Sequence, residues 1–330
     1  MRHFLLSYLV TIAALAIAFC WAGWQGLLVC GLMIVMEVSF SFDNAVVNAT
    51  VLREMSAKWQ LRFLTWGMVL SVFGMYYLFP LLIVSVATGL GLPEVMHIAI
   101  HDPKTYSQHL MQSHTQIATF GGMFLLMVFL NFIMDDCKEL HWLGGIEKKL
   151  ASLGRLESVE IIIALGLLLA LQAVLPETQR LSAMLAGVCG IGLYIVIQSA
   201  MGFLGVANPE QHMHGYSSLM GFIYLNILDA SFSLDAVVGS FAISNDIVII
   251  VLGLSAGAMF VRSLTLHLVR KGTLEQYVFL EHGAHYGIGA LAVIMLVSLT
   301  VPVSQIITGL VGIAFILLSL YSSVRYNRKR

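Results

Sequence analysis

The stretch "LMIVMEVSFSFDNAVVNATVL", residues 32–52, has the apolar character of a membrane-spanning helix but contains two acids, Glu37 and Asp43. A charge at the centre of a transmembrane span costs about 2.5–3.5 kcal/mol on insertion scales. Acids at such a depth therefore need a compensating partner, a proton or a bound cation. This stretch predicts a helix that lies in a membrane and has a function beyond spanning it.

A second stretch, "LNILDASFSLDAVVGSFAIS" at residues 225–244, repeats the pattern with Asp229 and Asp235. In both stretches the two acids are six residues apart and enclose a Ser-Phe-Ser sequence. In a continuous helix, six residues place two side chains about 9 Å apart along the axis and on different faces. Either each acid of a pair faces a different partner, or the helix is interrupted at Ser-Phe-Ser so that both acids meet at one point. We expect the interruption in both helices.

The composition places the whole chain in a membrane. Of its 330 residues, 59% are hydrophobic and 11% are charged, whereas soluble domains carry about 25% charged residues. We expect an all-α polytopic membrane protein in which residues 1–330 form a single transmembrane domain. A net charge of −1 gives no basic surface for nucleic acid. The bacterial inner (cytoplasmic) membrane is the expected location.

Apolar windows long enough to cross a bilayer predict about ten transmembrane helices. They lie at residues 4–22, 26–49, 62–88, 117–134, 158–175, 181–204, 217–243, 246–269, 284–301 and 304–323. With both termini in the cytoplasm, Lys104 and Arg180 are the two basic loop residues outside, against fourteen inside. This distribution follows the positive-inside rule.

The acidic motif occurs in the second and the seventh predicted span, which divides the chain into two halves. Residues 1–175 form the predicted first repeat and residues 176–330 the second, each with five spans. An odd number of spans gives the two repeats opposite orientations in the membrane. Inverted repeats of this kind build transporters whose ion site lies near the bilayer midplane on interrupted helices.

The candidate site contains oxygen donors, which suit manganese, calcium and magnesium better than zinc or copper. The predicted metal ligands are Glu37, Asp43, Asn44, Asp229 and Asp235, and the secondary candidates are Ser39, Ser41, Asn226, Ser231, Ser233, Arg262, His282 and His285. Arg262 lies inside a predicted span and is expected to pair with an acid or to act as a gate. The two histidines lie at i and i+3 at the mouth of the ninth predicted span.

At these motifs the sequence resembles the TerC family of integral membrane proteins, named for tellurium resistance. Glu37, Asp43 and Asn44 match the family's first acidic pattern, and Asp229 and Asp235 match the second. The segments "GGMFLLMVFLNF" (121–132), "HWLGGIEKKL" (141–150) and "EHGAHYGIGALAVIML" (281–296) resemble a less characterised branch of that superfamily. The resemblance implies efflux of divalent cations, chiefly manganese. The chain differs in having Ala236 at the position that corresponds to Asn44.

These observations predict a secondary transporter that exports a divalent cation, with manganese as the expected ion, in exchange for protons. The ion is then a transported ligand, no cofactor is permanently bound, and the chain is not an enzyme. The sequence contains no Walker A motif, which disfavours ATP-driven pumping by this chain. Two alternatives remain open: a non-transporting membrane subunit of a metal or tellurite stress-resistance complex, and an intramembrane metalloenzyme built on His282, His285 and the acids. Homo-oligomers and stress-complex partners also remain open.

Overall fold

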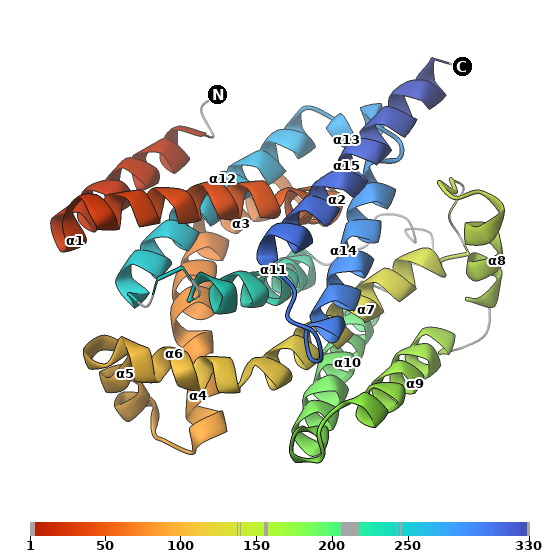
Figure 1. Ribbon diagram of the computed structural model, residues 1–330. Coiled ribbons are helices and arrows are strands. Elements are labelled where there is room, and N and C mark those ends of the chain that lie inside the picture. Colours follow the sequence, from red (N-terminus) through yellow and green to blue (C-terminus); the bar gives the residue numbers. More distant parts are fainter. Residues whose placement is uncertain are drawn as a thin grey trace. The chain divides into compact units, whose positions relative to one another are not determined.

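The computed structural model describes residues 4–136, 138, 140–154, 158–205, 218–241, 243–244 and 246–328 (Figure 1). The described part is helical throughout and contains no strand. It forms two compact units, Met1–His114 with Leu204–Thr273, and Thr115–Phe203 with Leu274–Arg330. Each unit combines segments from both halves of the sequence, so neither predicted repeat coincides with a compact unit. The inverted repeat stays a prediction.

The first unit holds the helices that carry both acidic motifs. Its elements are α1 (Phe4–Phe40), α2 (Phe42–Glu54), α3 (Ala57–Val69), the π-helix η1 (Leu70–Leu78), α4 (Phe79–Thr88), α5 (Leu92–His101), α6 (Pro103–Gln112), α11 (Ser218–Ser240) and α12 (Ile247–Arg270). The second unit is built from α7 (His114–Ile133), α8 (Gly145–Leu153), α9 (Val159–Val174), α10 (Glu177–Gly205), α14 (Leu280–Val297) and α15 (Gln305–Asn327). The short helix α13 (Thr273–Gln276) follows α12 in the chain.

The long helix α1 consists of two segments separated by a break. Ala22 has φ −134° and ψ 21°, and Gly23 has φ 62° and ψ −149°, so neither residue is helical. Glycine adopts a positive φ without the steric cost that other residues meet. The break lies between the predicted spans 4–22 and 26–49.

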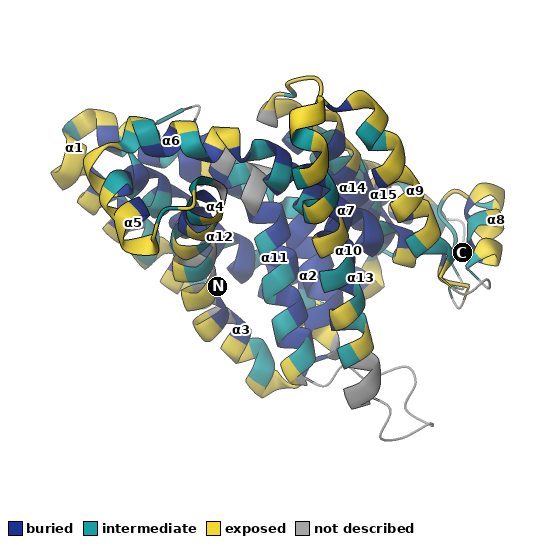
Figure 2. Cartoon of the chain, turned by 90° about the horizontal axis from the view of Figure 1, so that it is seen from below, coloured by how far each residue is buried: buried dark blue, intermediate teal, exposed yellow. Residues whose placement is uncertain are grey.

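Six helices in the described part are long and apolar enough to cross a membrane, and they make the chain an integral membrane protein. They cover Phe4–Ser39, His114–Ile133, Glu177–Ala200, Ile247–Arg270, Leu280–Val297 and Ile306–Asn327, and shorter apolar helices cover Tyr76–Val86, Val159–Val174 and Leu219–Ser233. Ten spans are not confirmed. Figure 2 shows exposed residues along α1 and α9, and Leu5, Trp24, Ile162 and Leu169 are among those that leave large apolar side chains uncovered. Such side chains suit contact with lipid.

In the first unit, α12 packs along α1 and also contacts α2, α3 and η1 (Figure 1). Two glycines of α12 make the close approach possible. A Cβ atom added to Gly253 would lie 2.6 Å from the Cβ of Met33, and one added to Gly257 would lie 2.5 Å from the Cβ of Glu37. Small residues at helix interfaces let backbones approach closely in membranes. Gly257 therefore determines how deeply Glu37 is seated between α1 and α12.

In the second unit, glycines also allow close packing of helices around α7. A Cβ atom on Gly122 would lie 3.0 Å from Leu296 of α14, and one on Gly289 would lie 2.7 Å from the ring of Phe129. Phe124 of α7 also meets Tyr194 of α10 edge to face, with ring centroids 6.0 Å apart. Close apolar contacts therefore hold these helices together, with a hydrogen bond from the Thr115 hydroxyl of α7 to Oε1 of Gln179 on α10 at 3.1 Å.

Gly257→Ala is expected to lower the free energy of unfolding by about 1–3 kcal/mol, the range typical of overpacking a tight interior. The added methyl group would overlap Glu37, and neither helix backbone can move without disturbing the other contacts of α12. Thermal unfolding of the purified protein in detergent measures the effect.

Gly31→Ala is the matched control, because a Cβ atom at that position of α1 meets Leu15 at 3.9 Å, an ordinary contact distance. This variant is expected to match or exceed the stability of the wild type, since alanine favours helix over glycine by about 0.5–1 kcal/mol. Equal melting temperatures for the two variants would contradict the proposed packing.

Candidate functional site

The first acidic motif is interrupted at one residue. α1 ends at Phe40 and α2 begins at Phe42, with Ser41 between them at φ −99° and ψ 20°. The amide of Ser41 still donates to the carbonyl of Glu37 at 3.0 Å, and the amide of Ala45 donates to the carbonyl of Ser41 at 3.0 Å. The predicted interruption is therefore a kink rather than an unwound segment, and these carbonyls stay in backbone hydrogen bonds.

The second acidic motif is not interrupted, so the prediction for it is wrong. α11 runs from Ser218 to Ser240 through the Ser-Phe-Ser sequence. The hydroxyl of Ser231 donates to the carbonyl of Ile227 at 3.0 Å. Serine tolerates a helix interior when its hydroxyl bonds back to the preceding turn in this way. Between Asp229 and Asp235 there is also neither proline nor glycine to end the helix.

Asp229 lies at the centre of the buried polar groups in the first unit. One carboxylate oxygen, Oδ2, forms an ion pair with Nη2 of Arg262. The other, Oδ1, accepts hydrogen bonds from Nδ2 of Asn44 at 2.9 Å and from Nδ2 of Asn48 at 3.3 Å. Arg262 is 1% exposed and Asp229 is 6% exposed. Arg262 thus pairs with an acid, as predicted, and this acid is the first of the second motif.

The guanidinium group of Arg262 also contacts α3. Its Nη1 donates to the carbonyl oxygen of Phe63 at 2.9 Å, and its Cζ lies 4.5 Å from the centre of the Phe63 ring. Gly67 lies one helical turn after Phe63, and a Cβ atom there would overlap Nη1. The absence of a side chain at Gly67 therefore leaves the Phe63 carbonyl open to the arginine. Arg262 connects α12 with both α3 and α11.

Glu37, the first acid of the first motif, has different partners. Its Oε1 accepts hydrogen bonds from Ser41 Oγ at 3.1 Å and from the Tyr76 hydroxyl at 3.2 Å. The Tyr76 oxygen also lies 3.4 Å from Ser233 Oγ on α11. Tyr76 belongs to η1, and π-helical turns occur frequently at functional sites. Of the predicted secondary ligands, Ser41 therefore contacts Glu37, and Ser233 contacts the tyrosine that bonds to Glu37.

Two buried amide oxygens face away from Asp229. Oδ1 of Asn44 and Oδ1 of Asn48 accept no hydrogen bond from any described residue, although the two residues are 3% and 0% exposed. An ionised carboxylate only accepts hydrogen bonds, so both amides must turn their NH2 groups toward Asp229. A buried acceptor without a donor is unusual in a folded protein. Amide oxygens are also common ligands of hard cations.

Of the remaining predicted ligands, Asp43 and Asn226 make local contacts within their own helices. Asp43 is buried in the first turn of α2, where its Oδ1 accepts from the amide of Asn44 at 2.9 Å. A carboxylate is favoured there by the helix dipole, so Asp43 stabilises the start of α2. Asn226 donates to the carbonyl of Phe222 at 2.7 Å, and Ser39 lies near the end of α1. The backbone of Asp235 lies in α11, but its side chain is outside the described residues.

The described side chains contain no group of three or more His, Cys, Asp or Glu residues that could hold a metal ion. Among the described acids, Glu37, Asp43 and Asp229 therefore form no such cluster in this conformation. Asp229 is held by Arg262, and Glu37 is held by Tyr76. Asp235 is the fourth predicted acid and its side chain lies outside the described residues, so the predicted ligand set stays a prediction.

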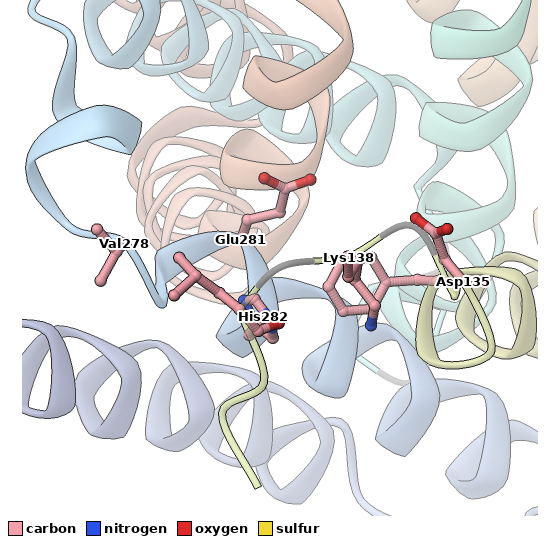
Figure 3. A pocket seen from close by; sticks show the side chains of 7 residues that line it. Asp135, Lys138, Val278, Glu281 and His282 are labelled. Atoms are coloured by element: carbon pink, nitrogen blue, oxygen red, sulfur yellow. The ribbon is translucent and has the colours of Figure 1, made fainter. Parts of the chain in front are cut away.

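His282 and His285 lie in α14 of the second unit, and His282 lines a pocket of about 270 Å³ (Figure 3). The pocket is lined by Phe132, Asp135, Lys138, Leu140, Val278, Glu281 and His282. Nε2 of His282 lies 3.0 Å from the carbonyl oxygen of Leu140. The ring of His285 stacks on Phe132 with centroids 3.8 Å apart, and its Nδ1 lies 2.9 Å from the Glu281 carbonyl. Backbone and aromatic contacts therefore orient both histidines.

Glu147, in α8 outside the apolar spans, is fully buried in the second unit. Lys138 Nζ donates to its Oε1 at 3.0 Å, the amide of Leu143 donates to its Oε2 at 3.1 Å, and His282 Nε2 lies 3.4 Å from Oε1. Burial alone would raise the pKa of Glu147, but the Lys138 ammonium and the Leu143 amide outweigh it and hold this pKa below its ordinary value. The carboxylate thus ties the segment after α7 to the start of α14.

Sequence analysis did not select three residues that the structure brings to these networks. Asn48 follows Asn44 by four residues, and this helical spacing was a usable signal because it places both amides on one face of a helix. Tyr76 and Glu147 gave no such signal. An aromatic residue in an apolar span is usually a packing residue, and an acid in a charged loop is usually a solvated surface residue.

Glu147→Gln is expected to lower the free energy of unfolding by about 1–3 kcal/mol near neutral pH, because it removes the charge that Lys138 faces. A group with a lowered folded-state pKa contributes stability above its ordinary pKa of 4.5 and loses it as pH falls below that value. The difference in melting temperature from the wild type should therefore shrink between pH 6 and pH 3.5, a range of about two units around that pKa.

Glu177→Gln serves as the control, since the Glu177 side chain is 90% exposed and lies 4.0 Å from Arg180. Its melting temperature should follow that of the wild type at each pH. A constant difference between Glu147→Gln and the wild type over the whole pH range would argue against the stabilised carboxylate.

A protein-family model described as "Protein of unknown function (DUF475)" matches residues 42–330. This description names neither the TerC family nor a substrate, so the relation to TerC stays a prediction. No curated protein and no solved structure matches the chain.

Proposed function

We propose that this chain, which belongs to the DUF475 family over residues 42–330, is a secondary transporter that moves divalent cations across the membrane. Manganese is the favoured ion, with calcium and magnesium as further candidates, and export in exchange for protons is the favoured mode. The observation that carries the proposal is a buried carboxylate, Asp229, beside two buried amide oxygens, those of Asn44 and Asn48, that no described residue satisfies.

The unsatisfied oxygens argue against a purely structural network. Leaving a buried acceptor without a donor costs about 1–3 kcal/mol, whereas a network that only joins helices can satisfy all its members. Here Asn44 and Asn48 lie on one face of α2, and both use their NH2 groups on Asp229. Turned by half a rotation, the same amides would present oxygen atoms beside a carboxylate, which is the ligand chemistry of a hard cation.

The charge balance of the first unit supports an exchange of cations. Its described buried side chains include three acids, Glu37, Asp43 and Asp229, and one base, Arg262. If all are ionised, an excess of about two negative charges remains within a membrane protein, where an uncompensated charge is costly. Protons and a divalent cation are interchangeable means of neutralising that excess, so binding of one favours release of the other.

The contacts of the histidines do not favour the metalloenzyme alternative. His282 and His285 are oriented by carbonyl groups and by Phe132 within the second unit. The alternative of a non-transporting subunit in a stress-resistance complex differs from transport in one measurable respect, because it predicts no flux.

The test is uptake of manganese and calcium into sealed proteoliposomes under an imposed pH gradient, with wild type, Glu37→Gln and Asn48→Leu. Both variants are expected to lose about tenfold or more of the flux, since removing one charged or buried ligand is worth at least about 1.4 kcal/mol. Glu37→Gln keeps an acceptor for Ser41 and Tyr76, so the fold is expected to persist.

Asp102→Asn provides the control, because Asp102 is an exposed acid that caps α6 through Thr105, and asparagine caps helices equally well. Its flux should equal that of the wild type. A monodisperse wild-type protein that moves neither ion would overturn the transport proposal. Normal flux in both site variants would instead place the pathway elsewhere.

A further inference from the structure

We propose that Arg262 is a tethered cation, which occupies the Asp229 carboxylate when the site is empty and is displaced when the transported cation binds. This inference rests on the proposed transport function and assigns the arginine a role in it. The ion pair is therefore a competitor of the substrate. Arg262 would set the affinity of the site and drive release of the ion after transport.

The first argument is that Arg262 has contacts that do not involve Asp229. Nη1 is bound to the Phe63 carbonyl oxygen at 2.9 Å, and the guanidinium lies over the Phe63 ring at 4.5 Å. Gly67 leaves the space that these contacts need. Hydrogen bonding and cation–π attraction can hold the guanidinium on α3 while Nη2 withdraws from the carboxylate. The arginine therefore has a polar position available when a cation arrives.

The second argument comes from the two amides beside the carboxylate. Asn44 and Asn48 donate their NH2 groups to Oδ1 of Asp229 in this conformation, and their oxygens have no donor within the described chain. A divalent cation at Asp229 would repel both the guanidinium and the NH2 groups. Rotation of each amide would then bring Oδ1 toward the cation. Asn44 and Asn48 thus donate hydrogen bonds to Asp229 when Arg262 is paired with it, and they would act as ligands when the ion is bound.

The third argument is the permanence of the charge. A guanidinium keeps its positive charge at every physiological pH, unlike a lysine, which can lose its proton when buried. Asp229 is therefore neutralised without a proton when Arg262 is bound. After the ion leaves, the guanidinium returns to the carboxylate at a high effective concentration, because its side chain and the Phe63 carbonyl keep it close to Asp229. Rebinding of the ion is disfavoured by this return.

The experiment measures manganese binding by isothermal titration calorimetry with the full-length protein purified in detergent. Arg262→Met removes the competing charge and keeps an apolar side chain of comparable length. It is expected to bind manganese about tenfold or more tightly than the wild type, because in the wild type the arginine leaves only a small fraction of the protein competent to bind the ion. Manganese should also raise its melting temperature by more than it raises that of the wild type.

Two further variants make the result specific. Arg262→Gln removes the charge but keeps a donor for the Phe63 carbonyl, and it is expected to show the same tightening even if Arg262→Met does not fold. Arg262→Met combined with Asp229→Asn should lose the tight binding, because the contested carboxylate is then absent. Arg62→Met is the control, since Arg62 is exposed and stacks on Trp59 at 4.4 Å, and its affinity should equal that of the wild type.

The outcomes separate this inference from the transport proposal. Unchanged or weaker binding in both neutral variants, with manganese flux still present in the wild type, would overturn the role of Arg262 and leave transport in place. Neither binding nor flux in a folded wild-type protein would overturn both. Tighter binding together with slower release of manganese from loaded proteoliposomes is the result expected of a tethered competitor.

Discussion

The first unit depends on one buried ion pair, formed by Asp229 of α11 and Arg262 of α12. Either charge alone would be costly in an apolar span, because the desolvation of an unpaired ion costs several kcal/mol. The pair also fixes neighbouring helices, since Arg262 bonds to the Phe63 carbonyl on α3 and Asp229 accepts from Asn44 and Asn48 on α2. Four helices therefore meet at two side chains.

Glycine positions make this meeting possible. Gly257 allows Glu37 to lie against α12, and Gly67 allows the guanidinium to reach a backbone carbonyl. At both glycines, the absence of a Cβ atom leaves room for a charged side chain from another helix. The network is also incomplete, because the oxygens of Asn44 and Asn48 have no donor among the described residues. These oxygens are the atoms that the proposed transport function assigns to the cation.

The second unit carries its buried charges differently. Glu147 is enclosed outside the apolar spans and is bonded to Lys138, to the Leu143 amide and, more distantly, to His282. Lys138 also lies over the Phe132 ring at 3.9 Å. The described donors around Glu147 give both of its oxygens partners, and the same is true of Asp229. The two networks differ in the amide oxygens of Asn44 and Asn48 beside Asp229, which accept no hydrogen bond from any described residue.

The sequence by itself determined that the chain lies in a membrane, that its acids are duplicated, and that an arginine inside a span needs an acid. These conclusions follow from hydropathy and from the cost of burying a charge, which are properties of each segment alone. Tertiary structure decided which acid receives the arginine, that Tyr76 reaches Glu37, and that α11 continues through Ser-Phe-Ser although α1 and α2 are divided at Ser41. Which side chains pair depends on how helices that are distant in sequence pack against each other. Serine is compatible with both a continuous and an interrupted helix, because its hydroxyl can bond either to the preceding turn or to another side chain. The local sequence therefore could not predict which of the two motifs would be interrupted.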